Sequence, residues 1–172
     1  MITENLAKAL SDQINAEFYS AYLYLAMSAK ADDLGYKGLQ NWLFVQAQEE
    51  MAHATHMYEH LIERGALPSF GAIAAAEDAK ELNDVRPIFE KVLSHEEYVT
   101  SLINNIASLA MKENDHATYT FISWYVNEQV EEVDVANTLL KKVKLIENNP
   151  GQLYDLDTEL AARVFINPFP AA

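Results

Sequence analysis

The chain has 172 residues, half of them hydrophobic, with 26 acidic and 12 basic side chains that give a formal net charge of −14. This charge disfavours nucleic acids and anionic membranes as partners and favours cations. The chain contains no cysteine, which excludes disulfides and argues against thiolate-bound zinc and iron–sulfur clusters. We find no signal peptide and no apolar run long enough to cross a membrane, so we expect a cytoplasmic protein.

Only 5 Gly and 5 Pro interrupt the long periodic stretches, which predicts an all-α fold in a single domain over residues 1–172. Thr3 and Asp115 are candidate N-caps, and Gly35 and Gly65 are suitable helix terminators. The four long helices are predicted over residues 3–33, 36–64, 84–114 and 115–148. Residues 149–151, Asn-Pro-Gly, are expected to end the fourth helix, and a short fifth helix is predicted over residues 155–163.

The longest predicted connection covers nearly twenty residues, 65–83, and contains Pro68 and Gly71. Fully extended at about 3.3 Å per residue it reaches some 60 Å, whereas each long helix spans about 40 Å. The segment can therefore cross the whole bundle and make the second and third helices parallel. A linker between two domains fits poorly, because neither half could bury its apolar faces alone.

The inward-facing positions of the four long helices follow alternating steps of three and four residues. We call the inward-facing positions of one helix its seam. Each seam carries a carboxylate in its middle, where a helix bundle keeps its apolar core. The carboxylates are Glu17, Glu50, Glu96 and Glu132. The fourth seam is predicted to consist of Phe121, Tyr125, Glu128, Glu132, Val135 and Leu139.

Burying several carboxylates together requires a cation among them, because each ion loses hydration and like charges repel. No lysine or arginine falls on these seams near the acids, so a metal ion is predicted. Glu50 and His53 are three residues apart and face the same way on their helix. Carboxylates with one imidazole suit iron or manganese, and we favour iron. Tyr24 could orient a ligand or supply an electron, or it could be a core tyrosine with a satisfied hydroxyl.

A second, outer group of acids is formed by Glu49, Glu128 and Glu131, next to the seam positions. We interpret it as a third metal position or an exit route, and the alternative is a solvated acidic stripe. His56 and His60 add to His53 a pattern that could suggest zinc, but the His-Glu-x-x-His motif of zinc hydrolases is absent.

The sequence resembles the bacterial non-haem ferritins over nearly its whole length. The resemblance rests on Glu17, Tyr24, residues 48–53 (Gln-Glu-Glu-Met-Ala-His), His95-Glu96, and residues 124–132 (Trp-Tyr-Val-Asn-Glu-Gln-Val-Glu-Glu). It implies a ferritin-like four-helix bundle with one long crossover and a short C-terminal fifth helix. It also implies one iron held by Glu17, Glu50 and His53, and another held by Glu50, Glu96 and Glu132 with Gln129 close by. By the same resemblance Glu49, Glu128, Glu131 and Glu132 match a third iron site.

The function implied by this resemblance is iron storage, with oxidation of Fe(II) by O2 or peroxide and mineral deposition inside a hollow homo-oligomer of twenty-four subunits. Bacterioferritins carry a second Glu-x-x-His motif, where this chain has Gln129-x-x-Glu132. Met51 matches a haem-ligating methionine of those proteins, but non-haem relatives share it, and we expect no haem. The apolar segment 164–170 is predicted to be buried at a subunit contact.

Two other functions remain as alternatives. A ferritin-like di-iron oxidase or peroxidase would use the same carboxylates without storing iron. A helical interaction module without catalysis fits poorly, because such a module has no reason to place acids on four core seams.

Overall fold

The computed structural model describes residues 2–169, except for the side chains of residues 77 and 78. The elements in chain order are α1 (Glu4–Asp33), α2 (Lys37–Glu63), the 3-10 helix η1 (Glu77–Glu81), α3 (Val85–Lys112), α4 (His116–Ile146) and α5 (Pro150–Leu160). The described residues contain no strand, and no helix among them is both long and apolar enough to cross a membrane. The predicted all-α bundle is confirmed.

The ends of the four long helices lie within two residues of their predicted positions. The Thr3 hydroxyl accepts a hydrogen bond from Leu6 N at 3.3 Å, and Asp115 Oδ1 accepts one from Thr118 N at 3.0 Å, so both residues are N-caps. Gly35 and Gly65 have φ of 89° and 71°, a left-handed conformation that glycine adopts without strain after a helix ends.

The prediction for the fifth helix was wrong at its start, because α5 begins at Pro150 rather than near residue 155. The Asn149 side chain accepts hydrogen bonds from Gly151 N and Gln152 N at 3.1 and 3.2 Å and so caps a new helix. Proline is favoured in a first helical turn, where its missing N–H has no partner to lose. Residues that were interpreted as a terminator therefore end one helix and begin the next.

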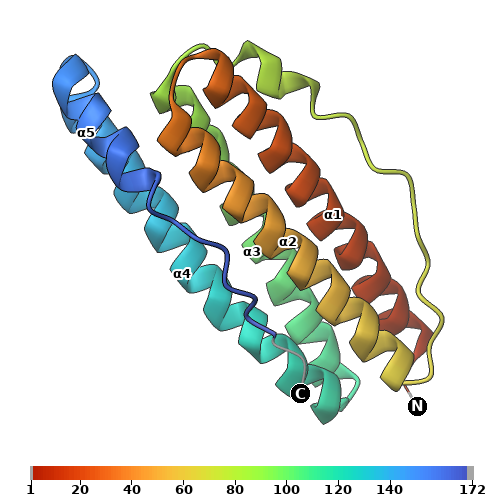
Figure 1. The fold of residues 1–172 in the computed structure, drawn as a ribbon. Coiled ribbons are helices and arrows are strands. Elements are labelled where there is room, and N and C mark those ends of the chain that lie inside the picture. The colour runs from red at the N-terminus through yellow and green to blue at the C-terminus, as the bar shows by residue number, and fades with distance from the viewer. Residues whose placement is uncertain (1, 170–172) are drawn as a thin grey trace.

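The long connection between α2 and α3 crosses the bundle, as predicted. Figure 1 shows it running along α1 from one end to the other, so that α2 and α3 are parallel. Asn15 on α1 fixes it in place, because its Nδ2 donates to Ser69 O at 3.2 Å and its Oδ1 accepts from Gly71 N at 3.0 Å. The short helix η1 near its end was not predicted from the sequence.

The apolar core is divided into two clusters. The upper cluster, at the α5 end of the bundle in Figure 1, includes Leu23, Leu43, Phe89 and Leu140. The lower cluster, at the opposite end, includes Leu10, Met57, Ile103 and Ile122. The residues between the two clusters along each long helix are the polar seam positions, so the middle of this bundle is not apolar.

The fourth seam was predicted incorrectly in part. The buried residues of α4 are Thr118, Ile122, Tyr125, Gln129, Glu132, Ala136, Leu140 and Val143. Phe121, Glu128, Val135 and Leu139 are only partly buried. Apolar residues lie on both sides of this seam, and the prediction followed the wrong side. Phe121 instead stacks against the ring of His60 at 3.8 Å between centroids. Tyr125 and Glu132 belong both to the predicted seam and to the observed buried residues of α4.

Candidate metal centre

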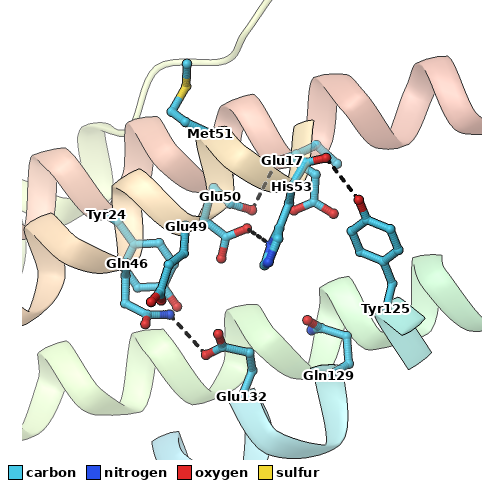
Figure 2. A network of polar contacts seen from close by, with 12 residues as sticks. Glu17, Tyr24, Gln46, Glu49, Glu50, Met51, His53, Tyr125, Gln129 and Glu132 are labelled. Carbon is cyan, nitrogen blue, oxygen red and sulfur yellow. Dashed lines mark hydrogen bonds and ion pairs between the residues drawn. The ribbon is translucent and has the colours of Figure 1, made fainter. Parts of the chain in front are cut away.

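A layer of buried polar side chains crosses the middle of the bundle. Glu17, Glu50, Glu96 and Glu132 come from α1, α2, α3 and α4 in that order, and all four are buried. His53 lies one turn after Glu50 and is equally buried. The four helices therefore bring together the five residues that the sequence placed on their seams. Figure 2 shows the layer from close by.

Three of these residues form a compact group. Glu17, Glu50 and His53 each offer one ligand atom, and these atoms lie within 4.8 Å of one another. His53 Nδ1 is 3.3 Å from Glu50 Oε2. Two atoms of these residues, Glu17 Oε2 and His53 Nε2, are buried without a hydrogen-bond partner. Buried polar atoms are rarely left without a partner, and a site that binds an ion accounts for such atoms.

The other two carboxylates are held by neutral donors. The Tyr24 hydroxyl donates to Glu96 Oε1, and Gln129 Nε2 donates to Glu96 Oε2 at 3.1 Å. Gln46 Nε2 donates to Glu132 Oε2 at 3.0 Å, and Figure 2 shows these two side chains pointing toward one another from α2 and α4. These contacts satisfy the two carboxylates in place of a cation.

Sequence reasoning missed part of this hydrogen-bonding network. Gln13 and Gln46 lie on the predicted seams, but neither was assigned a role. Gln13 Nε2 donates to Glu17 Oε1 at 2.8 Å, as Gln46 does to Glu132. Buried amides one turn away from a buried acid were the signal. Gln129 was predicted only from the family resemblance, and it is buried where the predicted seam had Glu128.

Burial raises the pKa of every carboxyl group in the layer. The pKa of Glu17 is raised by burial and then by the charge of Glu50, and that of Glu50 by burial and then by Glu96. Burial and the charge of Glu132 raise the pKa of Glu96 to about 8. The pKa of Glu132 is raised as well, by burial and then by Glu49. The Glu96 carboxyl group therefore keeps its proton at neutral pH, and a bound cation would replace that proton.

The imidazole of His53 is held from the opposite side by aromatic residues. The Tyr125 hydroxyl donates to the backbone oxygen of His53 at 3.2 Å and contacts His56 Nδ1 at 2.9 Å. The rings of Trp124 and Tyr125 both meet the His53 ring edge-on at 5.7 Å between centroids. These contacts support the ring on one side, while its Nδ1 lies beside Glu50 and its Nε2 stays without a hydrogen-bond partner, so a ring nitrogen is available to a metal ion. His56 and His60 do not join the group.

The outer acids are not gathered in the same way. Glu49 and Glu128 are partly buried, whereas Glu131 is exposed. Among the described residues, the group of Glu17, Glu50 and His53 is the one set of three or more ligands within 4.8 Å. Glu49 instead pairs with Arg163, whose Nη2 lies 2.5 Å from Glu49 Oε2. The predicted absence of a base near the acids concerned only residues on the helical seams. Arg163 lies beyond α5, off those seams, and its side chain reaches Glu49.

Met51 lies outside this network, whereas Phe169 in the terminal segment stacks on His56 at 3.7 Å and meets the His53 ring edge-on at 6.1 Å between centroids. Met51 is exposed on α2, and Figure 2 shows it pointing away from the layer. Val164 and Ile166 are 74% and 79% exposed in the single chain, so the predicted subunit contact over residues 164–170 stays a prediction. Pro170 lies outside the described residues.

Comparisons with known proteins agree on one family. A model of the ferritin-like domain matches residues 7–146. The bacterial non-heme ferritin of Staphylococcus saprophyticus is 38% identical over 165 residues, 96% of this chain and 98% of the relative. A probable bacterial non-heme ferritin-like protein of Haemophilus influenzae is 37% identical over 160 residues, 93% of this chain and 96% of that protein. A solved open-pore ferritin from Archaeoglobus fulgidus is 43% identical with a TM-score of 0.92, and the match covers 95% of this chain and 100% of that one.

Proposed function

This chain belongs to the ferritin family of iron storage proteins, and from that premise we propose that it oxidises Fe(II) to Fe(III) at the buried carboxylate layer before storing it. The substrates are Fe(II) and O2 or peroxide. We further propose that the chains assemble into a closed shell of twenty-four subunits in the cytoplasm, and that the ferric product is deposited inside that shell.

The observation that carries this proposal is the pair of buried ligand atoms without partners, Glu17 Oε2 and His53 Nε2. Both atoms belong to residues that, with Glu50, each offer one ligand atom within 4.8 Å of the others, a group of the right size to surround one ion. The charge of Glu96 also raises the pKa of Glu50, and the charge of Glu132 raises that of Glu96, so these carboxyl groups lie close together. We therefore assign one Fe(II) to Glu17, Glu50 and His53, and a neighbouring Fe(II) to Glu50, Glu96 and Glu132.

The proposed chemistry is a transfer of two electrons, one from each iron, to one O2 molecule, which takes up two protons and leaves as hydrogen peroxide. Anionic carboxylates favour Fe(III) over Fe(II), so they lower the potential of the bound iron and favour its oxidation. The incomplete set of protein ligands leaves room for the oxidant. Protons held by the raised-pKa carboxyl groups leave when the ions bind. Tyr24 and Gln129 keep the Glu96 carboxylate in a fixed orientation through their hydrogen bonds.

The outer acids Glu49, Glu128 and Glu131 are proposed to receive iron on its way out of the oxidation site. Their partial exposure makes them weaker ligands than the buried group. Substitution of Glu128 or Glu131 should therefore change repeated turnover more than the first oxidation. Unchanged kinetics over many turnovers in both variants would remove this role.

The test is aerobic loading of the apoprotein with several hundred Fe(II) per assembly, followed by size-exclusion chromatography with iron and protein detected together. We expect iron far above the number of binding sites to elute with a large assembly. Glu50→Ala should slow the initial oxidation by about 100-fold or more, because it removes a ligand shared by both irons. Glu59→Ala, an exposed acid on the same helix, is the matched control and should oxidise iron at the wild-type rate.

A small oligomer that keeps about two irons per chain would instead favour the alternative, a di-iron oxidase or peroxidase without storage. An unchanged oxidation rate in Glu50→Ala would contradict the proposed site itself.

A further inference from the structure

The end of α5 is fixed against the beginning of α2. Asp157 Oδ1 accepts a hydrogen bond from Leu39 N at 2.8 Å, which satisfies a backbone donor in the first turn of α2. Asn41 Nδ2 donates to Arg163 O at 2.9 Å and to Ala161 O at 3.3 Å. These contacts determine where the chain emerges from α5, and therefore where the side chain of Arg163 begins.

From this position Arg163 reaches the outer acids. Its guanidinium carbon lies 4.8 Å from the centroid of the Trp42 ring, which supports it by a cation–π contact. Its Nη2 lies 2.5 Å from Glu49 Oε2. Figure 1 shows the segment after α5 running back along the bundle between α2 and α4, the helices that carry Glu49 and Glu132.

The charge of Arg163 acts on more than one acid. It opposes the effect of burial on the pKa of Glu49, and it does the same for Glu132. Only one arm of the guanidinium is paired with a carboxylate, and its Nη1 is buried without a hydrogen-bond partner. The side chain is thus held as a positive charge beside the acids rather than by a complete set of hydrogen bonds.

We propose that Arg163 is a built-in countercation of the outer acids, which occupies the place beside Glu49 that an iron ion takes and has to be displaced when iron binds there. This inference rests on the proposed function, because it concerns the release of iron toward Glu49. Arg163 is a positioning residue in this role, since it acts through Glu49 and touches no substrate. It lies beyond the last residue of α5, so its side chain can swing away without unfolding a helix.

Displacement by iron has a simple electrostatic basis. A divalent ion next to Glu49 and Glu132 replaces a single positive charge by two, and it can take ligands from both carboxylates. With no ion bound, Arg163 keeps Glu49 from repelling Glu128 and Glu132. The exchange makes the outer position weaker for metal than its carboxylates alone would be, which favours passage of iron over retention.

The test is calorimetric titration of the apoprotein assembly with Co(II), which is stable in air and reports its coordination by visible absorption. In Arg163→Gln we expect the weakest class of sites to bind Co(II) about tenfold more tightly, because a competing charge is removed. The class assigned to Glu17, Glu50 and His53 should be unchanged, because Arg163 does not act on Glu17 or Glu50. Arg86→Gln removes an arginine that pairs with Glu90 and Glu147 away from the layer, and it should leave all classes unchanged.

Two further variants keep the result interpretable. In a Glu49→Gln background the effect of Arg163→Gln should be much smaller, which a merely structural role of Arg163 would not produce. Arg163→Lys keeps the charge and should tighten the weak sites less than Arg163→Gln does. Unchanged or weaker Co(II) binding in Arg163→Gln, or equal effects of the Lys and Gln variants, would overturn the proposal. If the wild-type protein itself showed no tight class of Co(II) sites, that result would instead contradict the proposed function.

Discussion

The middle of this bundle and its two ends are built from the same four helices, but the ends bury apolar side chains and the middle buries acidic ones. At the ends, the seams supply Leu, Ile, Phe and Met side chains that form the upper and lower clusters. In the middle, the same seams supply carboxylates that repel one another and hold protons. The ends stabilise the fold through burial of apolar surface, whereas the middle lowers stability and supplies the proposed metal ligands.

The comparison shows why a binding layer can exist inside such a bundle. Each buried carboxylate outside the compact group accepts a hydrogen bond from a neutral amide or phenol, which limits the cost of its burial. The two clusters on either side hold the helices at the spacing that the layer requires. Changes in the clusters should therefore affect the fold, and changes in the layer should affect metal binding.

Phe89→Ala in the upper cluster is expected to give the largest effect on stability, a loss of roughly 3–5 kcal/mol in the free energy of unfolding. Phe89 is fully buried and packs against Trp42 with ring centroids 5.7 Å apart, so its removal leaves a cavity. Denaturant unfolding of the apoprotein measures the change, with Val130→Ala on the exposed face of α4 as control. A loss below about 1 kcal/mol would mean that the clusters do not carry the fold.

Glu96→Gln in the layer is expected to act in the opposite direction. The pKa of Glu96 is about 8 in the folded protein and near 4.5 when unfolded. Between these values the folded state binds more protons than the unfolded state, so the apoprotein loses stability as the pH rises from about 4.5 to 8. The glutamine variant lacks this loss and should be more stable than wild type by roughly 1–4 kcal/mol at pH 8, with little difference at pH 5.

The measurement for Glu96→Gln is chemical unfolding of both apoproteins across that pH range, with Glu97→Gln on the exposed face of α3 as the matched control. The same variant should bind Co(II) more weakly, because an amide replaces a charged ligand. If the free energy of unfolding had the same pH dependence in wild type and Glu96→Gln, Glu96 would not hold a proton in the folded protein at neutral pH.

Tyr24→Phe is expected to have the smallest effect, because Tyr24 belongs to both regions. Its ring packs in the upper cluster and its hydroxyl donates to Glu96 in the layer. The variant keeps the packing and loses the hydrogen bond, so stability should change by about 1 kcal/mol and metal affinity at Glu96 by roughly three- to tenfold. Denaturant unfolding measures the stability, calorimetric titration with Co(II) measures the affinity, and single-turnover iron oxidation measures the rate. Slower oxidation with unchanged Co(II) affinity would indicate that Tyr24 supplies an electron rather than orienting a ligand.

The four long helices and their buried carboxylates could be predicted from the sequence, because hydrophobic period and helix caps are local signals. Glu17, Glu50, Glu96 and Glu132 stood out as exceptions to that period, and the structure buries all four. The start of α5 could not be placed, because Asn149 caps as readily as it terminates. Arg163 could not be found at all, since its approach to Glu49 depends on how α5 docks and not on any spacing along the chain.

The position of Arg163 depends on how α5 docks, and this docking depends in turn on Gly38. A Cβ atom on Gly38 would lie 1.6 Å from Asp157 O and 2.5 Å from Asp157 C, so the two backbones can meet only because this residue carries a hydrogen atom as its side chain. Any other residue there must push α5 away from α2 and carry Arg163 with it. A change of one methyl group at the start of the second helix would thereby alter the proposed passage of iron at acids that it never touches, and a search for variants confined to charged residues would overlook it.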